Sequence, residues 1–118
     1  MIGALVIGHG DFAQSLVDAV FAIAGKQDRV VAISNKSLSM ENLRGLIKEK
    51  IEEMGEVIVF TDLPGGSCTI ACKSLRVPVI TGVNLPILLE FALMREKWHI
   101  EELTENLQET GRKSIRRM

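Results

Sequence analysis

Aromatic side chains are scarce in this 118-residue chain. Phe and Trp make up 4% of it and Tyr is absent, so it lacks the platforms on which many proteins stack nucleic-acid bases. An excess of either charge is also missing, because 14 Lys and Arg stand against 15 Asp and Glu. Nucleic-acid binding usually needs a basic face, and this balance argues against nucleic acid as a partner.

Long apolar runs and targeting segments are missing as well. No run approaches the roughly 20 residues that cross a membrane. The amino terminus shows neither a basic region nor a signal-cleavage site. We therefore expect a cytoplasmic protein with no direct membrane insertion. The length suits a single domain over residues 1–118, and a hydrophobic content of 47% supports a packed core.

Cysteine is rare, and its spacing does not indicate a metal site. Cys68 and Cys72 lie four residues apart, as buried side chains on one helical face commonly do. Two cysteines give no disulfide framework. A zinc site would need further ligands, for which only His9 and His99 are candidates. We expect no metal and no cofactor.

Four apolar runs without polar alternation are typical of strands that are covered on both faces. They span residues 2–8, 29–35, 56–62 and 77–83. Helical patterns separate and follow them at 12–24, 39–54, 67–75, 85–97 and 100–110. Strands that alternate with helices predict an α/β fold with an open, mostly parallel sheet.

Sites in such sheets lie beyond the carboxyl ends of the strands, and three polar residues fall there. His9 follows the first strand within "LVIGHGDFAQ", and Asp62 ends the third. The segment "TDLPGGS" then leads into a helix that begins near Ser67. Strands one and three are often neighbours in doubly wound sheets, so these three side chains are expected to meet at one edge.

This combination suits a histidine that receives, holds and releases a phosphoryl group. A carboxylate that accepts one imidazole N–H fixes the tautomer and leaves the other nitrogen free to attack. Gly65 and Gly66 allow close backbone approach. A helix amino terminus offers free N–H groups to phosphate, and the Ser67 hydroxyl is a further donor.

Other interpretations remain open at this point. His9 alone suits an exposed turn, and Asp62 with Ser67 suits a turn and a helix cap. A hydrolase triad would need a nucleophile elbow that Ser67 lacks. An aspartate-phosphorylated receiver would need an acidic pair after the first strand, where only Asp11 occurs. A dinucleotide fingerprint would need a third glycine, and position 13 is Ala.

Three separated segments resemble one known family. They are "IGHGDFAQSL", "FTDLPGGSCTIA" and "TGVNLPILLE", and "ETGRKSIRRM" at the carboxyl end is also similar. The sequence resembles, over nearly its whole length, the IIA domain of the mannose family of the bacterial phosphoenolpyruvate:sugar phosphotransferase system. The resemblance implies a three-layer αβα sandwich with a four-stranded parallel core. It also implies a homodimer, with residues 113–118 as a candidate antiparallel strand exchanged between copies.

The resemblance implies a role for each site residue. His9 aligns with the histidine that takes phosphate from HPr and passes it to the IIB component during sugar uptake. Asp62 aligns with the carboxylate that orients the imidazole, and Ser67 with the loop that approaches the phosphoryl group. Gly65, Gly66 and Gly10 complete the expected phosphate contacts. Membrane transport components would be indirect partners.

Two alternatives share the same phosphohistidine. One is a phosphorylation-dependent regulatory module and the other is a phosphotransfer subunit of dihydroxyacetone kinase, neither with a transport role. The "GVNLP" segment resembles the mannose type more.

Surface features give further expectations. Phe12, Leu63 and Pro64 flank the site as a candidate docking patch for HPr and IIB, although Phe12 equally suits a core position. The carboxyl-terminal basic cluster suits a solvated end or a dimer strand. It consists of Arg112, Lys113, Arg116 and Arg117.

Overall fold

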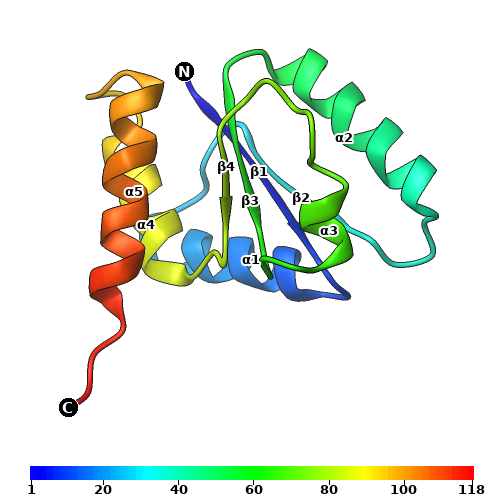
Figure 1. Cartoon of the computed structure of the whole chain (residues 1–118). Coiled ribbons are helices and arrows are strands. Elements are labelled where there is room, and N and C mark those ends of the chain that lie inside the picture. Colours follow the sequence, from blue (N-terminus) through cyan, green and yellow to red (C-terminus); the bar gives the residue numbers. More distant parts are fainter.

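The computed structural model describes all 118 residues, and its elements alternate as the apolar pattern predicts (Figure 1). The strands are β1 (Gly3–Gly8), β2 (Val30–Ser34), β3 (Val57–Thr61) and β4 (Val79–Thr81). The helices are α1 (Phe12–Ala24), α2 (Met40–Met54), α3 (Ser67–Ile70), α4 (Leu85–Met94) and α5 (Ile100–Ser114).

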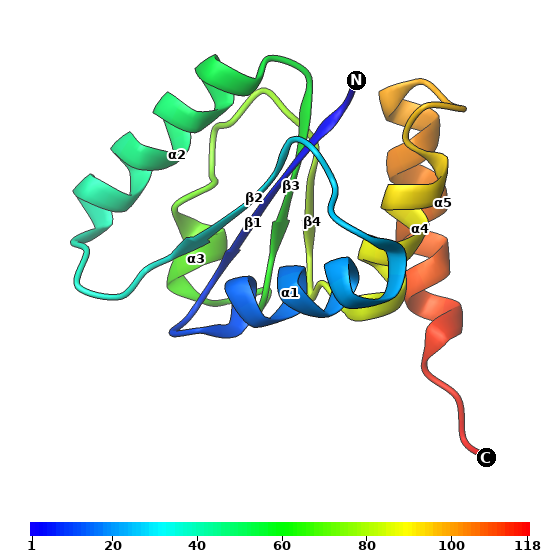
Figure 2. The ribbon, with the colours of Figure 1, turned by 180° about the vertical axis from the view of Figure 1, so that it is seen from behind.

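The strands form one sheet in the order β2-β1-β3-β4, and every pair is parallel. Helices α1, α4 and α5 lie on one face, and α2 and α3 lie on the other, as the opposed views show (Figures 1 and 2). This arrangement confirms the α/β class and the parallel four-stranded sheet. The two central strands, β1 and β3, are buried at every residue, which explains why their sequences do not alternate.

Each face of the sheet has its own hydrophobic cluster, because successive strand residues point in opposite directions. In β1, Ala4 and Val6 pack toward α1 and α4, whereas Leu5 and Ile7 pack toward α2. The larger cluster contains Phe60 edge-on to Phe91, with ring centroids 5.7 Å apart.

Capping residues set the helix boundaries. The Ser39 hydroxyl accepts the Asn42 N–H at 3.0 Å, and Gly55 ends α2 with φ +74°, so the helix expected over residues 39–54 is confirmed. Asn84 caps α4 by accepting the Ile87 N–H at 3.1 Å. None of the five helices combines the length and hydropathy needed to cross a membrane.

The expected helix over residues 67–75 is too long. Helix α3 ends at Ile70, because the next N–H groups turn tightly: Cys72 donates to the Thr69 carbonyl and Lys73 to that of Ile70. Ser74 then adopts φ +72°, a left-handed conformation that stops the helix.

The expected helix over 85–97 is also too long, since α4 ends at Met94. Arg95 turns inward, where its guanidinium donates to the carbonyls of Ile2 and Asp28 at 3.2 and 2.7 Å. It also lies 5.3 Å from the centre of the Phe91 ring, which favours a cation. These contacts accompany the burial of the side chain at the residue that ends α4.

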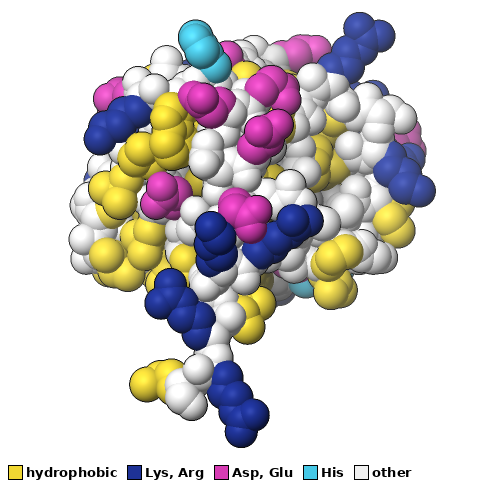
Figure 3. Space-filling model, turned by 60° about the vertical axis from the view of Figure 1, so that its left-hand side comes forward, with side chains coloured by type: hydrophobic (Ala, Val, Ile, Leu, Met, Phe, Trp, Pro, Cys, Tyr) yellow, Lys and Arg dark blue, Asp and Glu magenta, His cyan; other side chains and the backbone are white.

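The last helix, expected over 100–110, extends to Ser114 and takes up the start of the candidate exchange strand. The Ser114 hydroxyl donates to the Gly111 carbonyl and accepts from the Asn84 amide at 2.9 Å, which holds the final turn. Figure 3 shows acidic side chains over one end of α5 and basic ones over the other end and the protruding tail. Arg112 and Lys113 lie in the last turn, where their positive charges interact favourably with the negative end of the helix dipole.

Helices α4 and α5 pack closely through a glycine, and this generates a stability prediction. A Cβ added at Gly111 would lie 2.7 Å from Ile87 Cδ1, whereas one at Gly45 in α2 would meet nothing within 4 Å. Gly111→Ala is expected to lower the free energy of unfolding by about 1 kcal/mol through overpacking. Gly45→Ala should raise it by about 0.5–1 kcal/mol through helix propensity. The measurement is urea unfolding of both variants. If Gly111→Ala and Gly45→Ala raised the free energy of unfolding equally, the close packing of Gly111 against Ile87 would be contradicted.

Candidate functional site

The sheet register brings His9 and Asp62 together. Ile7 pairs with Thr61 in the β1–β3 ladder, so the residues that leave these two strands emerge side by side at the carboxyl edge. His9 and Asp62 are each the first residue beyond their strand. The neighbouring strands were expected from the alternation of elements, and the structure places both residues as predicted.

One oxygen of Asp62 binds His9 twice. Asp62 Oδ2 accepts the backbone N–H of His9 at 2.8 Å and lies 2.7 Å from the imidazole Nδ1. A carboxylate only accepts hydrogen bonds, so Nδ1 carries the proton in this pair. The neutral imidazole therefore has its lone pair on Nε2, on a side chain that is 45% exposed.

The environment of Asp62 keeps the carboxylate ionised. Burial by itself would raise the pKa of Asp62, but the backbone and side-chain hydrogen bonds from His9 outweigh it. The net result is a pKa below the usual value of 3.8. The second carboxylate oxygen, Oδ1, is buried without a hydrogen-bond partner in the protein. At neutral pH, Asp62 is therefore an acceptor that fixes the His9 tautomer.

Ser67 and Gly66 lie against the imidazole from the other side. The Ser67 hydroxyl is 3.2 Å from His9 Nε2. A Cβ added at Gly66 would lie 3.1 Å from His9 Cε1 and 3.4 Å from Leu63 Cβ, closer than a side chain ordinarily fits. Position 66 therefore disfavours a side chain, and the Ser67 hydroxyl lies at the imidazole nitrogen that Asp62 does not contact.

Helix α3 is shorter than expected, which alters how its amino terminus could bind phosphate. Four residues align too few peptide dipoles for a sizeable macrodipole. The backbone N–H groups of Gly65, Ser67 and Cys68 nevertheless have no acceptor within the protein. The loop therefore offers individual free N–H groups, and it lacks the field of a long helix.

Cys68 belongs to the site, which the four-residue spacing to Cys72 did not indicate. Its Sγ lies 3.9 Å from His9 Nδ1, and the side chain is fully buried. Burial raises the pKa of the Cys68 thiol to about 11, with a further rise from the Asp62 charge. Its position directly after Ser67 was the only signal in the sequence.

His9, Asp62 and Cys68 form a group whose ligand atoms lie within 4.8 Å of one another. Three donor atoms are fewer than the four of a structural zinc site, and His9 Nδ1 already shares a proton with Asp62 Oδ2. His99 lies elsewhere, in a hollow with Met1, Glu56 and Trp98.

Three threonine hydroxyls support the loop that carries Gly66 and Ser67. Thr69 Oγ1 donates to the Leu63 carbonyl at 2.6 Å and lies 2.8 Å from Thr61 Oγ1 and 3.1 Å from Thr81 Oγ1. These contacts tie the loop to the ends of β3 and β4. Sequence reasoning missed this hydrogen-bond network, in which Thr61 and Thr81 end β3 and β4 and Thr69 belongs to α3.

The loop that carries His9 is held by β2. The Ser34 hydroxyl donates to the Gly10 carbonyl at 2.7 Å, and the Gly10 N–H faces Asn35 Oδ1 at 3.4 Å. Gly10 has φ +55°, a conformation that disfavours a side chain. The glycine after His9 therefore shapes the turn, and its N–H is directed to Asn35.

The predicted docking residues are exposed and lie in the chain close after His9 and Asp62. Phe12 is 39% exposed and Leu63 is 56% exposed, and Pro64 is exposed as well. Phe12 is therefore not a core residue, because its ring is open to solvent at the start of α1. Ile70, 38% exposed, is a further apolar side chain at the end of α3.

Comparison with known proteins identifies the family of the chain. The family model described as "PTS system fructose IIA component" matches residues 3–108. The fructose-specific EIIA component of the phosphotransferase system of Bacillus subtilis is 30% identical over 98% of this chain and 85% of its own. The crystal structure of the EIIA component from Streptococcus agalactiae superposes with a TM-score of 0.91 at 25% identity, covering 99% and 97% of the two chains.

A second structural relative is the IIA protein associated with a fucose utilization operon in Streptococcus pneumoniae. It has a TM-score of 0.78 at 30% identity and covers 92% of this chain and 90% of its own. The chain thus belongs to the IIA components of the sugar phosphotransferase system. Membership gives it the general role of a phosphoryl carrier in that system.

The Asp62 pKa generates a pH prediction. Because the folded-state pKa lies below the unfolded value, the ionised carboxylate stabilises the fold above about pH 4. That contribution is lost as pH falls through the folded pKa. The difference in free energy of unfolding between wild type and Asp62→Asn should therefore narrow below pH 4. Asp11→Asn is the matched control, since it removes one exposed charge from the same end of the sheet.

The measurement is chemical denaturation between pH 7 and pH 2. A difference between wild type and Asp62→Asn that stays constant over this range would contradict an ionised, hydrogen-bonded Asp62.

Proposed function

We propose that His9 Nε2 accepts a phosphoryl group from the phosphohistidine of HPr and passes it to a histidine of a IIB component. The observation that carries this proposal is the double hydrogen bond from His9 to Asp62 Oδ2. It holds the proton on Nδ1 and leaves the Nε2 lone pair directed toward Ser67 and solvent. A nucleophile in that position meets a partner histidine without entering a deep pocket.

The transfer exchanges one phosphorus–nitrogen bond for another. The His9 Nε2 lone pair attacks phosphorus while the bond to the donor imidazole breaks, and the donor nitrogen keeps that electron pair. The His9 ring gains positive charge as Nε2 bonds to phosphorus, and the Asp62 carboxylate at Nδ1 stabilises this charge. Passage to IIB is the same exchange in the forward direction, with His9 as the leaving imidazole.

Positioning does most of the catalytic work in such a transfer. The Ser67 hydroxyl lies 3.2 Å from Nε2, and the free N–H groups of Gly65 and Ser67, in the same loop, are further donors for phosphoryl oxygens. The absence of a side chain at Gly66 leaves room beside the imidazole. Gly10 contributes through the shape of its turn.

A role in sugar uptake is favoured over the regulatory module and the dihydroxyacetone kinase subunit. Its support is the similarity to a fructose-specific EIIA component over 98% of the chain. The sugar itself is selected by other components, so the site geometry carries no sugar preference.

The first test is phosphate transfer. Incubation with phosphoenolpyruvate, Enzyme I and HPr should give a phosphorylated protein whose label is lost in acid and retained in base. His9→Ala should abolish the label, and Asp62→Asn should slow its appearance by at least about tenfold, because the tautomer is no longer fixed. Label that persists in His9→Ala would overturn the assignment, and base-labile label would indicate an acyl phosphate on Asp62.

The second test concerns docking. Leu63→Asp places a charge in the apolar rim and should reduce the rate of transfer from HPr by about tenfold or more, since interface cores exclude charge. Leu93→Asp is the matched control, because Leu93 is 66% exposed on α4, away from the site. Equal rates for the two variants would contradict a docking role for Leu63. Circular dichroism checks that both are folded.

A further inference from the structure

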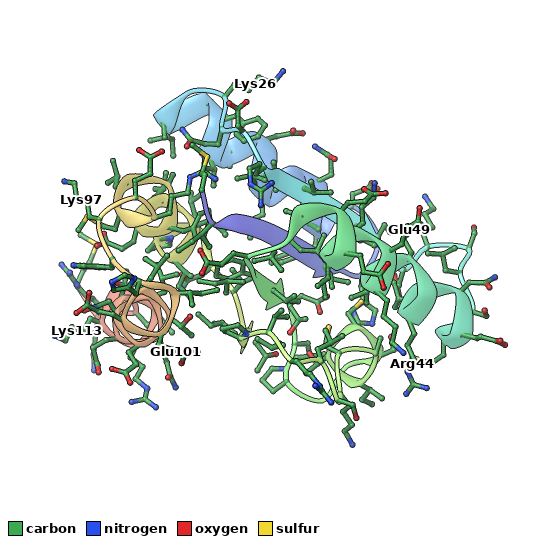
Figure 4. All side chains as sticks on the ribbon, turned by 90° about the horizontal axis from the view of Figure 1, so that it is seen from above. Lys26, Arg44, Glu49, Lys97, Glu101 and Lys113 are labelled. Atoms are coloured by element: carbon green, nitrogen blue, oxygen red, sulfur yellow. The ribbon has the colours of Figure 1, made fainter.

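A second hollow lies outside the His9 site, between α2 and the turn that follows α3. Its volume is about 400 Å³, and its lining is mostly basic. The lining residues are Arg44, Lys48, Ala71, Lys73 and Ser74. Figure 4 shows Arg44 on the side of α2 that faces α3, whereas Glu49 lies on the opposite side of that helix. We call this hollow the basic cleft.

The cations of the basic cleft are not neutralised within the protein. The ion pairs of the chain are His9–Asp62 and Lys50–Glu53, and neither reaches the cleft. Arg44 and Lys48 lie one turn apart on α2, a spacing at which like charges destabilise a helix. Lys73 adds a third positive charge from the opposite wall, and no acidic side chain lines the space.

The wall opposite α2 has an unusual backbone. Ser74 adopts φ +72° in a tight turn in which the Leu75 N–H donates to the Cys72 carbonyl at 3.3 Å. A residue with a side chain adopts this conformation at a cost, and such residues concentrate at ligand clamps. The turn places Lys73 and the Ser74 hydroxyl at the cleft.

We propose that the basic cleft binds a small anion with two or more phosphoryl groups. Arg presents a planar fork that matches phosphate oxygens, and Lys presents a compact charge with three donors. Cations on two facing walls suit a ligand that has a charged group for each wall. The volume lies within the usual range of small-molecule sites, and a concave space favours such a ligand over a flat protein surface.

The binding test uses inorganic pyrophosphate as the probe. Amide signals of Lys73 and Ser74 are followed by ¹H–¹⁵N NMR during titration of the full chain at constant ionic strength. Saturable shifts are expected, with at least about tenfold weaker binding for inorganic phosphate, which cannot reach both walls. Lys48→Gln should weaken pyrophosphate binding by about tenfold, as loss of one charge-assisted hydrogen bond predicts.

Two controls make the test specific to the basic cleft. Lys26→Gln removes the same charge from a surface position that Figure 4 places far from Arg44, and it should keep the wild-type affinity. His9→Ala should leave the shifts of Lys73 and Ser74 in place, because they do not originate at the phosphoryl-transfer site. The three variants change exposed residues, and their spectra report directly whether they are folded.

Four outcomes would overturn the proposal. The first is the absence of a saturable shift at the amides of Lys73 and Ser74 when pyrophosphate is added. Lys26→Gln could weaken binding as much as Lys48→Gln, which would indicate diffuse attraction to the surface. The shifts could vanish in His9→Ala. A short polyglutamate peptide could bind these amides where pyrophosphate does not, which would assign the cleft to an acidic protein segment.

Discussion

A single carboxylate oxygen determines how this protein presents its histidine. Asp62 Oδ2 accepts both the backbone N–H and the imidazole N–H of His9. It therefore fixes both the path of the loop and the orientation of the imidazole ring. The two residues are 53 positions apart and meet only because β1 and β3 are adjacent and parallel. The buried central pair of strands is therefore a condition for the chemistry as well as for the core.

The layered fold could be predicted from the sequence because its signals are local and repeated. The apolar runs of β1 and β3 lack alternation, Ser39 and Gly55 mark the ends of α2, and both properties follow from backbone chemistry within a few residues. The strand-end rule then selected His9, Asp62 and Ser67 without any knowledge of contacts. These three side chains do meet.

What the sequence could not provide depends on distant contacts. Helix α4 stops where Arg95 finds carbonyls from the first and second strand regions, and α5 continues because Ser114 reaches Asn84. The threonine chain under the site likewise joins three separate segments, and Cys68 looked like an ordinary core residue. Helix patterns report hydrophobic faces, and they do not report a hydrogen bond to a residue 30 or 93 positions away.

Arg95 has a consequence for the integrity of the whole chain. It is a buried cation without a carboxylate partner, and its hydrogen-bond acceptors are the carbonyls of Ile2 and Asp28 and the side chain of Gln27. Fraying of the first few residues would remove the Ile2 carbonyl from this buried charge, which is costly. The residue that precedes β1 is thereby tied to the residue that ends α4, at the end of the sheet opposite His9.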